Sequence, residues 1–569
     1  MAAIHPIGIT KGPGETAHEF TFVTPDREQS IKAGEFVYYE AVVDGKPRRV
    51  LGRVSGRRPV RLFPDGFLAD PEVAPEVVAS MIGYAPQEPE LFEITVTILG
   101  YHDPALHDFV NPRLPPRAGC PIYIADDGML AEVLNRRRVG ETGAAHIGSL
   151  LSRPAGQVPV VLDAGALTST HLAIIASTGA GKSYLAGVLL EELLGPHNRA
   201  AVLVVDPHGE YDTLDQMERV AAFRSADGYQ PEIHIVRPGD IKVRFCALKL
   251  GDLRYLLGDL SEKMHYYLGQ VYRSMERRYH SQWTRGQFEV MLRAGPKGKP
   301  VTDPQADEDL DDDEAQGDAE EDSTVGALLW RFNNVFKSPI FDDYDSLPLR
   351  QLFRPGRCTV LQLNDVEERE QQVVVATILR RLWQARMDTE RKRVDEASES
   401  YLPYPAFVLI EEAHNFAPAA ANVITSQILK RILSEGRKFG VAVGLISQRP
   451  GRLDADVLSQ CMTQFILRIV NPVDQARVAE SVESVGRDLL GELPALSKGQ
   501  AVVAGAAVNT PVLCRVRPRL TEHGADDLDA PSRWVQWWAN GQDSGRERDL
   551  SFLAQPPTRG RNKLFKVSK

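Results

Sequence analysis

The sequence predicts an α/β protein in which a small N-terminal β-barrel precedes a mostly parallel sheet that carries a helical insertion. Residues 1–150 contain short alternating apolar segments separated by Gly and Pro, such as Phe92–Ile98, which is typical of a small barrel or sandwich. From about residue 160, near-continuous apolar strands alternate with helical stretches, which indicates a parallel sheet covered on both faces. Residues 247–350 interrupt that alternation.

The strands of the parallel sheet are expected to be short, apolar and bounded by polar or turn residues. One of them directly precedes a Gly-rich loop, and the helical run Tyr184–Leu194 follows that loop. The other expected strands are Ala201–Asp206, Thr359–Asn364, Phe407–Glu411, Val441–Ser447 and Phe465–Ile469, with a helix over Gln371–Arg386.

A chain of 569 residues is too long for one core, so several domains are expected. We expect the barrel at 1–150, an α/β core at 151–246 and 351–520, the insertion at 247–350 and a tail at 521–569. In the insertion, Leu253–Trp283 has a helical pattern rich in aromatic and basic residues. These either pack on the main domain or form a surface for a partner or nucleic acid.

The net charge of −11 does not exclude nucleic-acid binding, because its source is local. Asp303–Asp322 contains twelve acidic and no basic residues, so the rest of the chain carries a net charge of about +1. The segment around it, about 296–324, is expected to be a disordered loop. An active role, such as mimicking DNA to block a site, is the alternative.

The remaining composition indicates a cytoplasmic protein. The five cysteines are scattered and form no C-x-x-C pair, so they predict buried thiols in a reducing compartment. No apolar run approaches the ~20 residues of a membrane span. The N-terminus has no basic stretch followed by an apolar run, so we expect no secretory signal.

The loop after the first core strand predicts a nucleotide-binding site. Residues 176–183 follow the pattern G-x-x-x-x-G-K-[ST], except that Ala176 replaces the first Gly. The loop and the following helix N-terminus would hold phosphates, Lys182 would reach the β- and γ-phosphates, and Ser183 would ligate Mg²⁺. The nucleotide-binding residues are expected to be Ser177, Thr178, Gly179, Ala180, Gly181, Lys182, Ser183 and Tyr184.

Phosphate binding alone does not make an ATPase, because hydrolysis also needs groups that hold Mg²⁺ and activate water. Two adjacent carboxylates are candidates for these roles. Glu411 and Glu412 follow an apolar strand, and α/β sheets bind ligands at the carboxyl ends of their strands. Glu411 is expected to bind Mg²⁺ through water. Glu412 is expected to polarise the attacking water.

Three further residues are candidates for the same reaction. Gln448 follows the Val441–Ser447 strand and is placed to sense the γ-phosphate or orient water; the alternative is a plain turn set by Pro450. Arg437 ends a helix, where it either complements the helix dipole or serves a neighbouring subunit as an arginine finger. Asp206 ends a strand, where it either assists Mg²⁺ or water, or only shapes a turn.

Taken in order, four motifs resemble the HerA/FtsK group of ring-forming P-loop motors, specifically HerA-like ATPases: Ala176–Ser183, Asp206–Tyr211, Glu411–His414 and Ser447–Pro450. Asn111–Gly119 and Ala145–Ser149 are similar to the end of that family's barrel and its junction with the motor. The resemblance spans most of residues 1–515.

The resemblance implies a RecA-like P-loop motor domain and a HAS-barrel-like N-terminal domain. The polar C-terminal tail, 521–569, either is flexible or docks across a neighbouring subunit as a brace. The resemblance also implies a homohexamer that hydrolyses ATP with Mg²⁺ to translocate double-stranded DNA through its ring. Lys182, Ser183, Glu411 and Glu412 would form the site of one subunit, and Arg437 would act in trans. The barrel face would dock an effector, either a NurA-like nuclease or a sirtuin-type NADase.

Three hypotheses therefore stay open. The first is a DNA-translocating ATPase in DNA end processing or anti-phage defence. The second is an ATP-binding ring scaffold that assembles and activates an effector without obligatory DNA translocation. The third is a conjugation or secretion ATPase of the same superfamily.

Overall fold

The computed structural model describes residues 5–524 and 529–541, apart from 15, 17, 27–30, 61–90, 104–105, 107, 281, 296–318 and 483–484. These residues fall into two compact units, one ending at His523 and the other beginning at Gly524. The second unit contains the helix α15, Ala530–Gly541.

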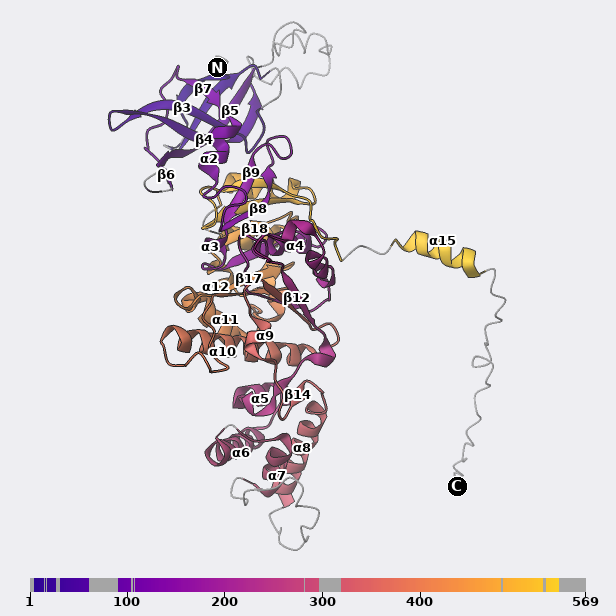
Figure 1. Ribbon diagram of the computed structural model, residues 1–569. Coiled ribbons are helices and arrows are strands. Elements are labelled where there is room, and N and C mark those ends of the chain that lie inside the picture. Colours follow the sequence, from indigo (N-terminus) through magenta and orange to yellow (C-terminus); the bar gives the residue numbers. More distant parts are fainter. Residues whose placement is uncertain are drawn as a thin grey trace, which may run out of the picture. The chain divides into compact units, whose positions relative to one another are not determined.

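The N-terminal strands form a barrel that is closed by six of the strands described there (Figure 1). The strands pair in the order β2-β1-β7-β3-β4-β5, and β2 also pairs with β5, which closes the ring. Alternate side chains such as Phe20 and Phe22 point inward and are fully buried. The strands are β1 Gly8–Pro13, β2 Glu19–Thr24, β3 Phe36–Val43, β4 Lys46–Pro59, β5 Phe92–Asp103 and β7 Pro121–Ile124; β6 Asp108–Val110 pairs with β5, and the helix α2 Asp127–Leu134 follows.

A second sheet of eleven strands, counted over the described residues, confirms the predicted α/β core. Its order is β12-β15-β11-β16-β17-β10-β18-β19-β20-β8-β9; the pairs from β12 to β18 are parallel and those from β18 to β9 are antiparallel. The strands are β8 Ala144–Leu150, β9 Pro159–Asp163, β10 Leu172–Ile175, β11 Val202–Asp206, β12 Glu232–Val236, β15 Arg357–Gln362, β16 Ala406–Ile410, β17 Val441–Ser447, β18 Thr463–Ile466, β19 Gln500–Gly505 and β20 Val512–Val516.

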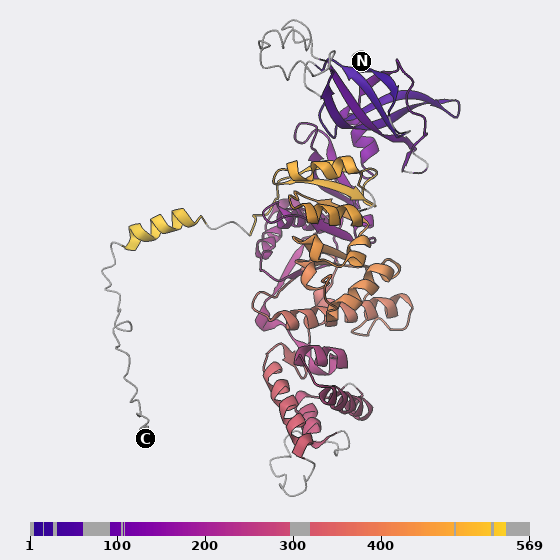
Figure 2. The same cartoon turned by 180° about the vertical axis from the view of Figure 1, so that it is seen from behind.

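Burial on both faces explains why the core strands are apolar throughout. Along β10, Ala173 and Ile175 belong to one buried cluster, whereas Leu172 and Ile174 belong to another. Helices cover these faces, and α10 and α11 are seen among them in the reverse view (Figure 2). The helices are α3 Ala164–Leu167, α4 Lys182–Leu193, α10 Glu368–Glu390, α11 Ile424–Glu435, α12 Ala455–Ser459, α13 Pro472–Ser481 and α14 Arg487–Glu492.

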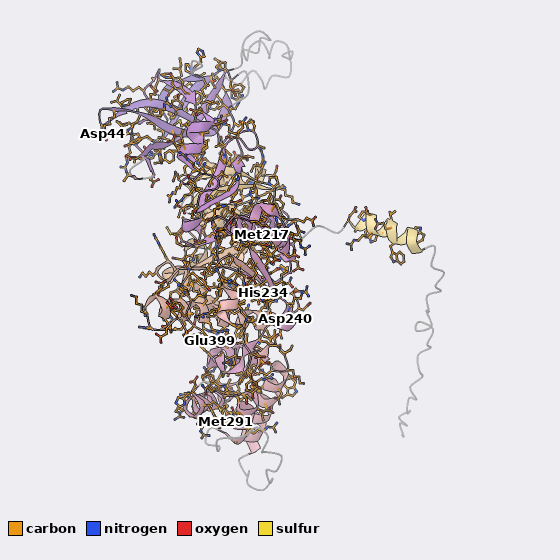
Figure 3. The ribbon with its side chains drawn as sticks, in the orientation of Figure 1. Asp44, Met217, His234, Asp240, Met291 and Glu399 are labelled. Carbon is orange, nitrogen blue, oxygen red and sulfur yellow. The ribbon has the colours of Figure 1, made fainter. Side chains whose placement is uncertain are left out.

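The insertion is helical, but Leu253–Trp283 is not one continuous helical segment. Gly258 adopts φ 75° and ends α5, and Ser261 caps α6 through the Met264 N–H. Met291 of α7, labelled in Figure 3, is buried in the same cluster as residues of the large sheet. The elements are α5 Leu250–Leu257, α6 Glu262–Tyr279, α7 Arg285–Ala294, α8 Ala319–Val335 and α9 Leu349–Leu352, with the paired strands β13 Val243–Arg244 and β14 Phe341–Asp342.

Most aromatic residues of this insertion pack inward. Trp283 is buried, while Tyr267 and Tyr272 are partly buried and donate hydrogen bonds to the carbonyls of Leu292 and Leu248. Tyr266 stays 67% exposed. The predicted acidic loop lies largely outside the described residues; its last residues belong to α8.

The strand β8 lies within residues 1–150, which we expected to form the barrel, but it pairs with β20 and β9 of the large sheet. We therefore propose a domain boundary before Ala144.

Within the described ranges, every helix is too short or too polar to cross a lipid bilayer. All five cysteines are free, and Cys358, Cys461 and Cys514 are buried.

Candidate nucleotide-binding and hydrolysis site

Three neighbouring strands end together at the candidate site. Ile175 of β10 pairs with Ser447 of β17, and Ile410 of β16 pairs with Leu445 of β17. The residues after β10, β16 and β17 therefore meet at one edge of the sheet, which is where open α/β sheets bind ligands. They include the predicted phosphate loop, the Glu411–Glu412 pair and Gln448.

The loop after β10 has the backbone that its glycines predict. Gly179 and Gly181 adopt φ values of 76° and 101°, which are costly for other residues. The helix α4 begins at Lys182, directly after Gly181. Ala176 is fully buried and avoids positive φ, so its methyl group fits in place of a glycine. The Ser177 N–H is held by the Arg468 carbonyl at 3.0 Å.

Lys182 lies between the two predicted carboxylates. Its Nζ is 3.2 Å from Glu411 Oε2 and 3.5 Å from Glu412 Oε1, and all three side chains are buried. Burial acts to lower the pKa of Lys182, but the charges of Glu411, Glu210 and Glu412 outweigh it and raise that pKa. The lysine is therefore a firmly charged cation at the N-terminus of α4.

Glu411 has two donors. Tyr211 donates its hydroxyl to Glu411 Oε1 at 2.5 Å, and Lys182 contacts the other oxygen. Burial raises the pKa of Glu411, although the charge of Lys182 acts against this. Ser183 donates to Glu210 Oε2 at 2.5 Å, so Glu210 joins the site as a third carboxylate.

Glu412 is held in a strained conformation. Its φ of 47° is left-handed, which is uncommon for a residue other than glycine and typical of functional sites. Gln448 donates to Glu412 Oε1 at 2.6 Å and accepts from Thr178 Oγ1 at 2.7 Å. Gln448 therefore connects the phosphate loop to the residue expected to polarise water. His414 Nδ1 lies 3.2 Å from the other oxygen, Glu412 Oε2.

Asp206 does not face the open site. It is fully buried, and its carboxylate accepts the backbone N–H groups of His208, Gly209, Glu210 and Tyr211. Burial raises its pKa, while these four donors act to lower it. We therefore propose that Asp206 shapes the turn that delivers Glu210 and Tyr211, in place of the direct role expected from sequence.

Arg437 lies apart from this cluster, and the Tyr184 side chain contacts the segment after β20. Arg437 is exposed in the turn η7, Gly436–Phe439, which precedes β17. It is therefore at the opposite end of a seven-residue strand, about 20 Å away at ~3.3 Å per residue. The Tyr184 hydroxyl accepts the Arg519 N–H at 2.8 Å, and its ring meets His523 edge-on.

Sequence reasoning gave no specific role to Glu210, Tyr211 or His414. All three stood inside motifs that it singled out, but only their folded positions show which side chains they reach. The sequence analysis also did not name Lys498, whose Cγ would lie 3.9 Å from a Cβ on Gly181 and which is therefore a neighbour of the phosphate loop. No sequence signal marks it.

The donor set fits Mg²⁺. The Ser183 hydroxyl and the carboxylates of Glu210 and Glu411 supply hard oxygen ligands. Mg²⁺ at such sites is bound by one or two protein groups and the phosphates of the substrate. In the described part of the chain, no group of three or more His, Cys, Asp or Glu side chains could hold a metal by itself.

The family model and several relatives that match this chain are described as helicases. Residues 145–382 match the family model "Helicase HerA, central domain". The probable helicase MJ1565 of Methanocaldococcus jannaschii is 31% identical over 437 residues, which are 75% of this chain and 76% of that protein. The chain belongs to the HerA helicase family. Within this family, the DNA double-strand break repair helicase HerA of Pyrococcus furiosus is 29% identical over 77% of this chain and 81% of its own length.

Membership of the HerA family and the phosphate-loop geometry identify the chain as an ATPase with a RecA-like P-loop motor domain. Solved structures similar to it include VirB4 of Thermoanaerobacter pseudethanolicus, with 13% identity, a TM-score of 0.44 and coverage of 67% of this chain and 98% of that chain. The plasmid coupling protein TrwB in complex with ADP and Mg²⁺ has 13% identity and a TM-score of 0.43, covering 70% and 94%.

Proposed function

We propose that this HerA-family ATPase forms a homohexameric ring that hydrolyses Mg²⁺-bound ATP to translocate double-stranded DNA. The observation that carries the proposal is the contact of Lys182 with both Glu411 and Glu412 at the phosphate loop. The relatives named DNA double-strand break repair helicase support DNA as the substrate.

The geometry suggests how each group acts on ATP. The loop N–H groups and Lys182 bind the phosphates, which compete with Glu411 and Glu412 for the lysine. Ser183, with Glu411 and Glu210, would hold Mg²⁺, and the ion would neutralise phosphate charge. Glu412 takes up the proton of the attacking water. Gln448 connects Thr178 of the phosphate loop to Glu412 and senses the γ-phosphate.

The place of Arg437 supports an assembly of subunits. Its side chain is exposed at the amino end of β17, far from its own phosphate loop. In this proposal it acts on the site of the next subunit, where an arginine finger contributes roughly 10³–10⁵ in rate.

The test is ATP turnover with and without linear double-stranded DNA, with Glu412→Gln as the blank. We expect strong stimulation by DNA that vanishes in the blank. Turnover indifferent to DNA would contradict the motor. It would favour instead a ring scaffold that assembles an effector, and that alternative predicts that Glu412→Gln leaves effector activity intact.

The effector belongs to the same proposal. We infer a cytoplasmic role in DNA end processing or anti-phage defence, with a NurA-like nuclease or a sirtuin-type NADase docked on the barrel face. Affinity capture with the full chain, against a chain lacking the barrel residues 1–143 as the control, tests this. Capture that does not depend on the barrel would contradict it.

A further inference from the structure

One buried histidine has no part in the chemistry proposed above. His171 directly precedes β10 and is only 3% exposed. Its φ is 60°, a left-handed value that costs energy for a residue other than glycine. Such a conformation persists only where the surrounding contacts fix it.

The ring of His171 contacts two neighbouring elements. Its Nδ1 accepts the Val443 N–H of β17 at 3.1 Å, and the backbone of Leu433 in α11 lies close enough to act on the pKa of the ring, which it raises against the larger effect of burial. A side chain at the foot of β10 therefore contacts both the end of α11 and the start of β17. Between these two elements lies the turn η7.

The turn η7 also packs directly against the histidine. An ideal Cβ on Gly436 would stand 3.2 Å from His171 Cε1 and 2.2 Å from the Val441 carbonyl oxygen. Gly436 has an ordinary helical φ of −57°, so the missing side chain, not backbone freedom, is what the position requires. The next residue is Arg437.

The other end of the turn is held as firmly. Arg386 of α10 is 2% exposed and donates through Nε to the Phe439 carbonyl at 2.8 Å. The Phe439 ring packs edge-on against the Trp383 ring, with 5.1 Å between the two ring centroids. The turn η7 thus has both of its ends buried while Arg437 is exposed, and two buried polar side chains, His171 and Arg386, contact it. Burying such groups is costly unless they are bonded. Their effect is to fix the backbone under Arg437.

We propose that His171 is a positioning residue that sets the turn bearing Arg437 for use in the site of the neighbouring subunit. This inference rests on the proposed trans role of Arg437. A fixed backbone lowers the entropy lost when a long side chain is held in one geometry. His171 directly precedes β10, and β10 leads into the phosphate loop. The histidine therefore also joins the strand that carries this chain's phosphate loop to the turn that carries its Arg437.

The experiment uses mixed oligomers of the full chain. His171→Phe keeps the ring but leaves the Val443 N–H unpaired, and His171→Asn keeps an acceptor and tolerates positive φ. We expect His171→Phe to reduce turnover about tenfold to a hundredfold, part of the roughly 10³–10⁵ of an arginine finger, with nucleotide affinity almost unchanged. His171→Asn should retain more turnover than His171→Phe.

Mixing separates the trans role from a local one. Glu412→Gln subunits cannot hydrolyse ATP but carry an intact Arg437 turn. Turnover should therefore recover when they are mixed with Arg437→Ala subunits, and equally when they are mixed with His171→Phe or His171→Asn subunits.

Each failure has its own signature. Recovery with Arg437→Ala but not with either His171 variant would mean that His171 serves its own site, which overturns the inference. No recovery with Arg437→Ala would overturn the trans role itself. If His171→Phe does not fold, the same comparison is made with His171→Asn, whose thermal midpoint serves as the folding control.

Discussion

At the scale of single residues, the site depends on charges that are buried together. Lys182, Glu411 and Glu412 are each less than 10% exposed, and none could be buried alone without a large cost. Tyr211 and Gln448 donate to the two carboxylates and thereby fix their orientation. The sequence predicted the charged residues; the donors that orient them come from segments distant in the chain.

The first prediction concerns Lys182. Lys182→Ala should abolish nucleotide binding and turnover, because it removes the cation at the phosphate loop, which is also the positive charge shared by Glu411 and Glu412. Equilibrium nucleotide binding and turnover test this. Lys11→Ala, which removes an exposed ion pair with Glu93 on the barrel, is the control and should behave as wild type. Normal hydrolysis by Lys182→Ala would refute the site.

At the scale of elements, buried polar side chains join α4 and β10 to other segments. Glu191 of α4 is completely buried and accepts the N–H groups of Leu520 and Thr521 at 2.9 Å each. Arg517 pairs with it at 2.9 Å. The helix that begins at the phosphate loop is thus fastened to the segment after β20, a contact that no sequence pattern indicates.

Glu191→Gln should therefore loosen the segment after β20. Replacing a buried, paired carboxylate leaves Arg517 and Arg519 with less compensating charge, at a cost of about 3 kcal/mol. Hydrogen exchange at Leu520 and Thr521 should accelerate, and the thermal midpoint should fall. Glu289→Gln on α7 breaks an exposed ion pair with Arg293 and should cost less than about 1 kcal/mol. Equal effects of the two substitutions would argue against the anchor.

The second element-scale prediction concerns pH. Burial lowers the pKa of His171 to about 4 from its ordinary 6.5. In the unfolded chain, His171 therefore becomes protonated near pH 6.5. In the folded chain, it becomes protonated only near pH 4. Stability contributed by the neutral ring is complete above pH 6.5 and is lost as the pH falls toward 4, by about 3 kcal/mol in all.

The thermal midpoint should consequently fall more between pH 7 and pH 4.5 for the wild type than for His171→Asn. The comparison cancels the other groups that titrate in this range. Identical pH dependence of the two proteins would contradict the low pKa of His171.

At the scale of the whole molecule, charge is distributed unevenly along the chain. Asp303–Asp322 contains twelve acidic residues, so its removal changes the net charge from −11 to +1. Removal of this segment should therefore weaken the long-range repulsion between the protein and DNA phosphates. We expect deletion of this segment to tighten DNA binding severalfold at low salt, and the difference to shrink as salt screens it.

Binding of double-stranded DNA measured across a salt series tests this. The control replaces the same twelve residues by Asn and Gln, which keeps the length and removes the charge, and it should match the deletion. An effect of the deletion alone would assign the segment a role other than charge.

The sequence by itself determined the classes of structure and the chemical core of the site. Apolar strands predicted the buried parallel sheet because both of its faces are covered. Lys182 became a candidate through the phosphate-loop pattern, and Glu411, Glu412 and Gln448 became candidates because each follows such a strand. Strand ends on one edge must meet, so chain order and polarity sufficed. The helical pattern of Leu253–Trp283 did not reveal the break at Gly258, since a single glycine is tolerated within helices.

Only the tertiary structure decided what each side chain touches. Asp206 ends a strand as a ligand residue would, yet backbone N–H groups occupy its oxygens. Ser183 donates to Glu210, and His171 packs against Gly436. In both cases the fold brings together segments that are far apart in the sequence. Periodicity records which face of an element is buried. It does not record which partner lies on the other side.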